Sequence, residues 1–383
     1  MELGLISLGD RMADPRTGHL PSRRDRQGAI IEQALRASQA GFGSVWLGEH
    51  HFSDWIISAP EILLAAIAAQ TSTLRLGTGV TLLPIADPVR VAESFATLDV
   101  LSGGRVDVVA GRGILVDSYR QFGFDYARSR EQFEEKLDLL VRLWTEQKSD
   151  WKGEYRVALR NVTVEPRPVQ HPHPPLWVAG GSSSESVDLA ARLGLPLMLP
   201  SVFASPKKFV PMAERYRERY SAAGHDPSQM LVGGASYVFT MPRSQDAVET
   251  WRPYLESYYT FNQDRILASG ASLPMGKDKI PFSYEALLAG PAVCGSPAQV
   301  ADRLKQIGEM LSLDVHLLLM DLGGLPQAAL LEEIDLIGQQ VIPQLGPTTR
   351  NREPRPGSVD PGDRPSGREQ PMSIGPSSGK DRS

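Results

Sequence analysis

Three residues at the end of an apolar run carry side chains suited to proton transfer. They are Glu49, His50 and His51, and they follow the run SVWLG at residues 44–48. Because side chains alternate along an extended segment, the two neighbouring imidazoles point in different directions and make a poor pair of metal ligands. An imidazole can instead act as an acid or base near neutral pH. The segment therefore predicts proton chemistry at a strand end and no metal site.

Two further segments predict a site for an anion. Arg112 stands between two glycines in AGRGI, directly after a strand-like run, and a guanidinium group pairs well with phosphate. The segment WVAGGSSSES at residues 177–186 places glycines and serines before a helical pattern, where backbone N–H groups and hydroxyls bind anions. A structural ion pair of Arg112 and helix capping by Ser183 or Ser184 are the alternatives. Together the two segments predict a phosphate site.

Strand-like runs that alternate with helical patterns must position these side chains. Runs buried on both faces and joined by helices indicate a parallel sheet, and eight such units predict a closed (β/α)8 TIM barrel. The expected strands are residues 3–8, 44–48, 74–83, 105–111, 175–181, 195–200, 230–240 and 314–322. An open nucleotide-binding sheet is the alternative, but Leu82 occupies the third glycine position of its fingerprint in LGTGVTLL. The carboxyl ends of the barrel strands then gather the polar segments at one mouth.

Two long segments interrupt the repeat. Residues 149–175 alternate polar and apolar positions and are rich in proline, which predicts a short hairpin and loop inserted before strand five. Residues 250–290, after strand seven, are too long for an ordinary connection. They predict either a lid over the mouth or an extra helical hairpin that packs on the barrel or at a subunit interface.

Composition limits the class of protein. The formal net charge of −5 argues against a nucleic-acid partner, and the single cysteine, Cys294, fits a reducing compartment and a small buried residue. Residues 346–383 are rich in Pro, Gly, Ser and charge and predict a disordered tail, so one folded domain is expected over residues 1–345. With no signal peptide or membrane span evident, a cytoplasmic protein is expected.

The sequence resembles the bacterial luciferase-like, flavin-dependent monooxygenases. The resemblance extends over nearly everything up to about residue 345, and its most specific segments are WLGEHHF, LRLGTGVTLLPIADPVRVAE, LDVLSGGRVDVVAGRG and PLWVAGGSSSES. It implies a barrel that binds reduced FMN at its mouth, activates O2 as a flavin C4a-hydroperoxide and oxygenates a small organic substrate. It also implies a separate NAD(P)H-dependent flavin reductase as the source of reduced FMN, and a dimer, with a homodimer expected.

The resemblance assigns roles residue by residue. His50 matches the catalytic histidine and Glu49 is grouped with it as a catalytic residue, while the Gly79–Val80 bond matches a non-proline cis peptide beside the flavin ring. The expected cofactor-binding residues are His51, Gly79, Val80, Arg112, Gly181, Ser182, Ser183 and Ser186. Luciferase itself has a reactive cysteine where this chain has Gly111, so no thiol chemistry is expected near the flavin and light emission is in doubt.

Two other functions remain open from the sequence. One is an oxidoreductase of the same superfamily that uses the deazaflavin F420 for hydride transfer, although EHHF favours FMN because that branch more often has an aspartate before a single histidine. The other is a non-catalytic relative that only binds flavin, and the presence of His50 and Arg112 counts against it.

Overall fold

The barrel is closed by parallel strands on all sides. The computed structural model describes residues 1–181, 183–269 and 283–346. Among these residues, eight parallel strands form the ring, and pairing of β9 with β10 closes it. In ring order they are β1 (Glu2–Ser7), β2 (Ser44–Leu47), β3 (Arg75–Thr78), β5 (Val106–Gly111), β8 (Leu176–Ala179), β9 (Leu197–Met198), β10 (Val232–Thr240) and β12 (Val315–Leu319). The predicted TIM barrel is confirmed.

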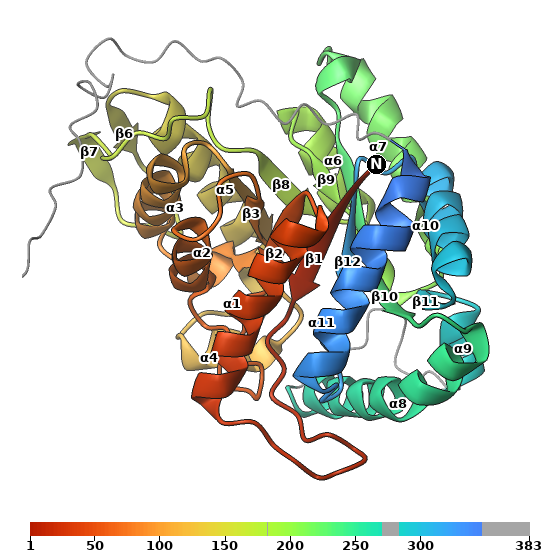
Figure 1. The fold of residues 1–383 in the computed structure, drawn as a ribbon. Helices are drawn as coiled ribbons and strands as arrows, with labels where there is room; N and C mark the ends of the chain where they lie inside the picture. The colour runs from red at the N-terminus through yellow and green to blue at the C-terminus, as the bar shows by residue number, and fades with distance from the viewer. Residues whose placement is uncertain (182, 270–282, 347–383) are drawn as a thin grey trace, which may run out of the picture.

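Helices surround this ring (Figure 1). They are α1 (Arg23–Ala40), α2 (Pro60–Ala68), α3 (Pro88–Ser102), α4 (Val116–Gln121), α5 (Ser129–Thr145), α6 (Ser184–Leu193), α7 (Val210–Ala222), α8 (Ser244–Ala268), α9 (Tyr284–Leu288), α10 (Pro297–Leu311) and α11 (Gln327–Leu336). Single helical turns occupy Leu83–Ile85, Tyr126–Arg128, Ser201–Phe203, Pro206–Phe209, Pro227–Gln229 and Ile342–Leu345, and a π-helix follows α11 at Ile337–Val341.

The helix ends follow local sequence signals. Ser22 begins α1 by accepting a hydrogen bond from the Asp25 N–H, and α1 ends at Gly41, which has a φ of 90°. In the segment ADPVR, Asp87 accepts from the Val89 N–H and Pro88 takes the first helical position of α3. These caps fix where α1 and α3 begin, and so they fix the lengths of the loops that reach the mouth.

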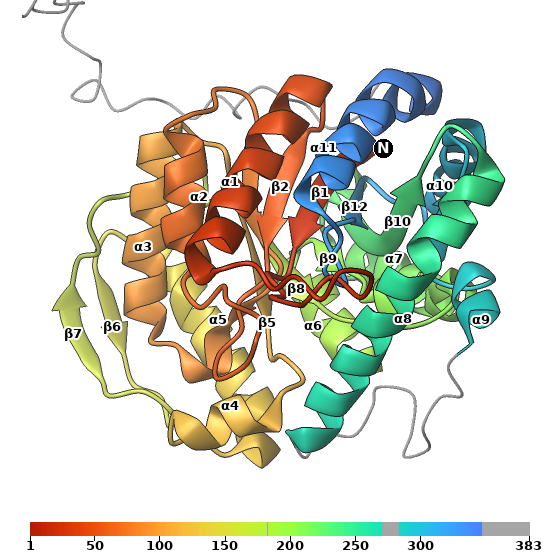
Figure 2. The same cartoon turned by 60° about the horizontal axis from the view of Figure 1, so that its bottom comes forward.

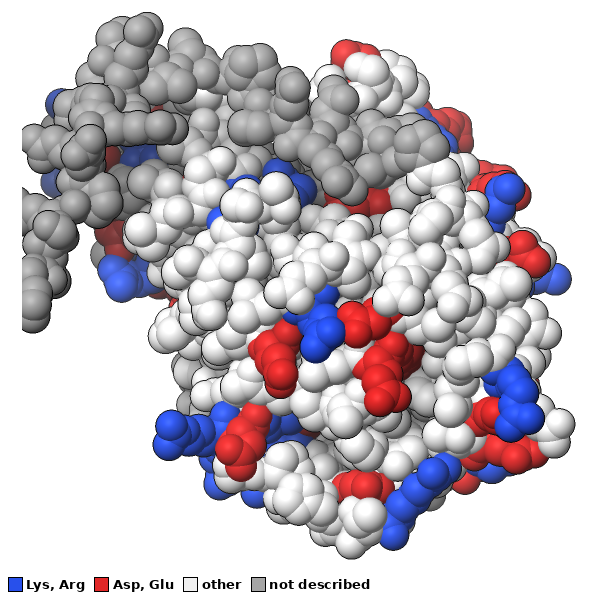
Figure 3. Space-filling model, in the orientation of Figure 1, with Lys and Arg blue, Asp and Glu red and all other residues white. Residues whose placement is uncertain are grey.

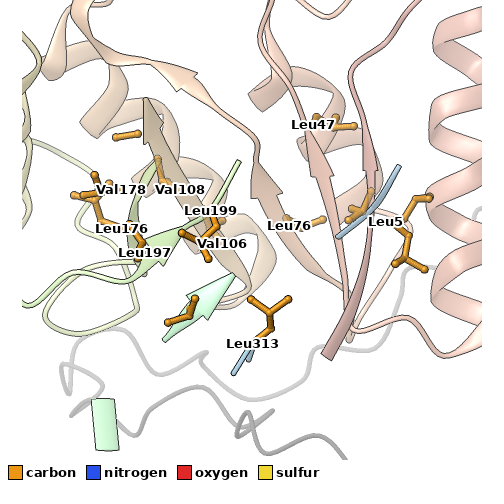
Figure 4. Close-up of a cluster of buried hydrophobic side chains, with 14 of the residues drawn as sticks. Leu5, Leu47, Leu76, Val106, Val108, Leu176, Val178, Leu197, Leu199 and Leu313 are labelled. Carbon is orange, nitrogen blue, oxygen red and sulfur yellow. The ribbon is translucent and has the colours of Figure 1, made fainter. Parts of the chain in front are cut away.

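Alternating side chains divide the core into two layers. Strand residues that face the helices form one layer, shown in part in Figure 4, in which Leu5, Leu47, Val108 and Val178 are labelled. Their sequence neighbours face the barrel interior, where the rings of Trp46 and Trp177 meet edge to face at 6.0 Å. Period-two alternation therefore buries both faces of each strand, as in other parallel barrels.

The interior is so full that one strand position must lack a side chain. A Cβ on Gly77 of β3 would lie 2.2 Å from the ring of Trp46. The Trp177 indole N–H donates to Asp107 Oδ1 at 2.9 Å, and the ring of His316 bonds Ser236 Oγ at 2.9 Å. Polar groups inside the barrel are thus held by bonds within the barrel.

The structure corrects three details of the predicted strands. The single strand expected over 74–83 is broken at the Gly79–Val80 cis bond into β3 and β4 (Thr81–Leu82). An unpredicted strand, β11 (Ala292–Gly295), pairs with β10. Cys294 in β11 is half-buried, whereas a buried residue was expected. Burial, with a smaller contribution from Glu333, raises the pKa of its thiol to about 12.

The structure confirms the hairpin predicted for the first insertion and favours one of the two alternatives for the second. β6 (Ser149–Trp151) and β7 (Leu159–Val162) form the predicted antiparallel hairpin before β8. In the second insertion, α8 packs Trp251, Tyr254 and Tyr258 onto the interior cluster, and Figure 2 shows α8 running along one side of the mouth. The described part therefore favours an extra helix packed on the barrel. Residues 270–282 of this segment and 347–383 of the predicted tail lie outside the described residues.

Charges on the face in Figure 3 are of both signs, with acidic side chains on either side of a basic cluster near its centre. One ion pair between two helices of this side is Arg36 of α1 with Asp335 of α11, at 2.9 Å. Within the described ranges, no helix combines the length and the apolar character needed to cross a membrane.

Candidate functional site

The loop after β2 presents His50 at the mouth. Its backbone folds back on itself, because the His50 N–H donates to the Ile57 carbonyl at 2.8 Å. The imidazole then stacks on the indole of Trp55, with ring centres 4.7 Å apart and an interplanar angle of 26°. His50 is therefore held in one orientation by its own loop.

The environment of His50 favours its neutral form. Burial is the main cause that lowers the pKa of the imidazole to about 4; a backbone hydrogen bond to Gly48 opposes the shift, and the neighbouring His51 adds to it. Nδ1 of the ring is buried and has no hydrogen-bond partner among the described residues. A cavity of about 580 Å³ adjoins the ring, lined by Arg23, Gln27, His50, His51, Phe52, Ser53, Asp54, Trp55, Ile56, Ser58 and Arg265. At neutral pH this ring is therefore uncharged beside that cavity.

Glu49 joins His51 to the next strand. One carboxylate oxygen accepts a hydrogen bond from His51 Nε2 at 2.8 Å, and the other accepts from the Leu82 N–H of β4 at 2.9 Å. The other flank of His51 meets the edge of Phe122, with ring centres 4.9 Å apart. Both oxygens of Glu49 are therefore used to fix His51 and the strand, which is the arrangement of a positioning residue.

Trp55 was missed in the sequence, although it lies four residues after His51. Its backbone pairs with Asp10 in an isolated antiparallel bridge, and its ring meets the edge of Phe261 of α8 at 5.0 Å. Its buried indole N–H has no hydrogen-bond partner among the described residues. Long-range contacts with the loop after β1 and with α8 place it, so the local pattern carried no signal for it.

The next strand reaches the mouth through Gly79 and Val80. Their peptide bond is cis, as the resemblance predicted, and the Val80 carbonyl accepts from the Glu49 N–H at 3.3 Å. A Cβ on Gly111 of β5 would lie 2.8 Å from the side chain of Val80. The absence of a side chain at Gly111, noted as a departure from luciferase, thus leaves the space that Val80 occupies.

Arg112 follows β5 and is half-buried. Its Nη1 donates to Ser129 Oγ at 3.2 Å, and the Tyr119 hydroxyl donates to the Arg112 carbonyl at 2.5 Å. No local pattern selects Ser129 or Tyr119, because both lie more than five residues further along the chain than Arg112. They hold the backbone and one end of the guanidinium, while its remaining N–H groups can serve an anion.

The glycine–serine turn follows β8, the strand next to β5. Gly181 has a φ of 121°, and Ser182 lies outside the described residues. Ser183 is the N-cap of α6, but its side chain makes no capping bond, and the Ser186 hydroxyl donates to the Ser183 carbonyl at 3.0 Å. Helix capping therefore does not account for the hydroxyl of Ser183.

The start of α6 is tied to the start of α5. Arg130 of α5 forms an ion pair with Glu185 of α6, with Nη1 and Oε1 3.2 Å apart. Arg130 directly follows Ser129, the residue that contacts Arg112. The two halves of the predicted site are thus a proton-transfer group after β2 and an anion-binding group after β5 and β8. In the described part of the chain, no group of three or more His, Cys, Asp or Glu could hold a metal ion.

Comparisons with known proteins identify the family of the chain and relatives of its fold. A model of the luciferase-like monooxygenase family matches residues 1–312. The oxygenase component of a flavin-dependent trigonelline monooxygenase from Acinetobacter baylyi is 24% identical over 335 residues, which cover 84% of this chain and 90% of that protein.

Solved structures share the fold. The monooxygenase RslO1 from Streptomyces bottropensis superposes with a TM-score of 0.75 at 26% identity, covering 90% of this chain and 100% of that one. An F420-dependent secondary alcohol dehydrogenase superposes with a TM-score of 0.68 at 20% identity, covering 90% and 99%. The same barrel therefore occurs in a protein named as a monooxygenase and in one named as an F420-dependent dehydrogenase.

Proposed function

The chain belongs to the luciferase-like monooxygenase family, and from this premise we propose that it is the oxygenase component of a two-component monooxygenase. It takes reduced FMN from a separate NAD(P)H-dependent flavin reductase and uses O2 to oxygenate a small organic substrate. The observation that carries this proposal is the neutral imidazole of His50, which borders a cavity of about 580 Å³ and whose buried Nδ1 has no hydrogen-bond partner among the described residues.

The residues at the mouth fit a flavin mononucleotide. Arg112, Ser183 and Ser186 would hold the phosphate, because a guanidinium and the start of a helix both favour an anion. Val80, whose side chain fills the space left open at Gly111, would lie against the flat ring together with Gly79 and His51. When bound, reduced flavin supplies the electrons that activate O2 for transfer of one oxygen atom to the substrate.

His50 is the catalytic residue of the proposed reaction. Since burial lowers its pKa to about 4, the ring is uncharged at pH 7 and its Nδ1 is able to accept a proton. Stacking on Trp55 keeps the ring in place as its charge changes. His50 thus takes a proton from a group bound in the cavity and returns it later in the cycle.

Glu49 holds His51 in place at the proposed flavin site. The carboxylate bonds that Glu49 makes to His51 and to the Leu82 N–H tie the loop after β2 to β4. We therefore assign Glu49 a positioning role in place of the catalytic role expected from the resemblance. His51 remains a cofactor-binding residue, held by Glu49 and Phe122.

A second candidate is hydride transfer with F420, since a dehydrogenase that uses this cofactor shares the fold. A relative named as a flavin-dependent oxygenase component, aligned over 84% of this chain, supports the first candidate. A protein that only binds flavin would not need the unpartnered nitrogen of His50.

We also infer a homodimer through α2 and α3. These helices border a surface hollow of about 590 Å³, and Ile62 and Leu101 at its edge are 67% and 69% exposed. These exposed apolar side chains, one on each helix, support the dimer that the resemblance implies. The expected result is a dimer by analytical ultracentrifugation that the double substitution Ile62→Glu and Leu101→Glu converts to a monomer; a wild-type monomer at micromolar concentration contradicts it.

The first test is anaerobic titration of the purified protein with reduced FMN and, separately, with reduced F420. We expect saturable binding of reduced FMN at micromolar concentration and, on mixing with oxygenated buffer, a transient absorbance that differs from that of oxidised FMN. Free reduced FMN without protein is the control, because it oxidises without such a transient.

The other outcomes each reject the proposal in a different way. Binding of reduced F420 alone, with no oxygen-dependent transient, would establish hydride transfer. Binding of FMN without any transient, together with no product from a panel of ketones, aromatic acids and terpenes, would leave only a flavin-binding protein.

A further inference from the structure

A second cavity lies on the other side of α1. It has a volume of about 860 Å³ and is bordered by the loop that follows β1, by α1, and by the segment from Asp321 to Leu330 that leads into α11. Figure 1 shows α1 and α11 side by side, with the loop after β1 below both. None of its lining residues borders the cavity beside His50, so the two cavities have separate linings.

Three buried acceptor oxygens in this lining lack a hydrogen-bond donor. They are Asp10 Oδ1, Gln33 Oε1 and Asp321 Oδ1, and none has a partner among the described residues. The three residues are only 2%, 2% and 6% exposed. Buried polar atoms are nearly always paired. When Asp10 is ionised, all three atoms are hydrogen-bond acceptors, which points to an occupant that carries N–H or O–H groups.

The opposite end of each side chain is firmly held. Asp321 Oδ2 accepts from Ser7 Oγ at 2.5 Å and from Arg26 Nη2 at 2.6 Å. Asp10 Oδ2 accepts from the Gly323 N–H at 3.3 Å, and Gln33 Nε2 donates to Gln327 Oε1 at 2.7 Å. The unpaired oxygens are therefore fixed in place and cannot turn away to find other partners.

The charge of the lining selects the sign of the occupant. Five carboxylates, those of Asp10, Asp14, Asp25, Glu32 and Asp321, and two guanidinium groups, those of Arg24 and Arg26, leave a formal charge of −3. Arg26 is already bonded to Asp321 and lies 3.9 Å from Asp10 Oδ1. Burial raises the pKa of Asp10 to about 7, opposed by Arg26 and reinforced by Asp321. A positive charge in the cavity would relieve this cost.

Apolar side chains complete the lining. Met12, Leu325 and Leu330 contribute aliphatic surface next to the carboxylates. The described residues offer no set of three or more acidic, His or Cys ligands for a metal ion. An occupant with a cationic head and an apolar body fits this combination better than a bare cation does.

We propose that this cavity binds a small organic cation, with a primary ammonium or guanidinium head and an aliphatic chain. The head donates hydrogen bonds to the unpaired oxygens of Asp10, Asp321 and Gln33, and the chain packs against Leu325 and Leu330.

The test is isothermal titration of the full chain at pH 8 with three probes of equal length. n-Pentylammonium should bind saturably and about tenfold or more tighter than n-pentanol, because hydrogen bonds between charged groups are stronger than those of a neutral hydroxyl. n-Pentanoate should not bind. Equal affinity for the ammonium and the alcohol would overturn the proposal and show that the oxygens are satisfied by solvent.

Gly28 allows a blocking variant that preserves the fold. It lies in α1 and lines the cavity, and a Cβ added there would meet no atom within 4 Å. Gly28→Trp should abolish binding of n-pentylammonium, whereas Gly28→Ala should retain it; both should keep the wild-type melting temperature or raise it, because glycine is a poor helix former. Undiminished binding by Gly28→Trp would contradict the assigned location.

Charge variants separate the carboxylates of the cavity from acidic residues elsewhere. Asp10→Asn keeps the shape and should weaken binding of n-pentylammonium about tenfold or more. Asp335→Asn, on α11 and outside the lining, should leave it unchanged. An equal loss of n-pentylammonium affinity in both variants would show that the cation responds only to the overall charge of the protein, which would reject the site.

Discussion

The mouth and the interior of the barrel each contain a histidine whose pKa is lowered by burial. The pKa of His50 falls to about 4 and that of His316 to about 3, and both rings have an Nδ1 without a hydrogen-bond partner among the described residues. The difference is the space around them. His316 is fully buried beside Ser236, whereas His50 borders a cavity.

The comparison teaches when an unpaired nitrogen indicates function. In the interior, the missing bond only lowers stability, since nothing can reach the ring. At the mouth, the ring of His50 borders a volume that a ligand can enter. The lowered pKa alone does not separate the two histidines, but the adjoining cavity does.

The largest expected effect is on turnover at the mouth. His50→Gln should lower the rate of substrate oxygenation about 10²- to 10⁴-fold, because a general acid or base contributes that much, and it should leave the Kd for reduced FMN within about threefold of the wild-type value. Stopped-flow kinetics and anaerobic titration measure the two quantities. Turnover at the wild-type rate would end the catalytic assignment of His50.

The next effect concerns the other half of the mouth. Arg112→Ala should weaken FMN about 10- to 100-fold, the equivalent of one or two charge-assisted hydrogen bonds, without changing the affinity for riboflavin, which lacks the phosphate. Fluorescence titration with both flavins measures the ratio, and Arg112→Lys, which keeps the charge, should show a smaller loss. An equal loss for both flavins would mean that Arg112 supports the fold and does not contact phosphate.

In the interior, the expected effect is on stability alone. His316→Ala should lower the free energy of unfolding by about 1–3 kcal/mol, since it leaves Ser236 unpaired and opens space. Urea denaturation followed by circular dichroism measures this loss. Turnover per folded molecule should change less than twofold, and a drop as large as that of His50→Gln would erase the distinction between the two regions.

The smallest effect is a pH dependence shared by both histidines. A histidine with a folded pKa below its unfolded value of about 6.5 contributes stability that is present above pH 6.5 and is lost as pH falls through the folded pKa. The wild-type free energy of unfolding should therefore decrease between pH 6.5 and 4, and the decrease should be smaller in His50→Gln and in His316→Ala. An identical decrease in both variants would assign it to other groups.

The general fold could be predicted because each strand carries its own signal. Runs such as those at residues 44–48 and 105–111 are buried on both faces, which requires helices on one side and a closed interior on the other. The break at Gly79 was invisible within one continuous apolar run, because it depends on how Glu49 and Val80 meet across two strands. β11 was missed since four residues beside β10 make too short a pattern.

The candidate site was predictable only in its local parts. EHHF and AGRG are readable because glycines and titratable residues stand at strand ends. The stacking of Trp55 on His50 and the contact of Ser129 with Arg112 depend on the return of distant loops. The cavity beside α1 combines residues more than 300 positions apart, such as Asp10 and Asp321, so no sequence window contains it.

The half-buried thiol of Cys294 makes the chain convenient for site-specific labelling. With a pKa of about 12, only on the order of 10⁻⁵ of this thiol is thiolate at pH 7, and the thiolate is the form that reacts with maleimides. It is the one cysteine in the sequence. A new cysteine placed on an exposed position of α8 would therefore take up a spectroscopic probe almost alone, without prior removal of the native residue.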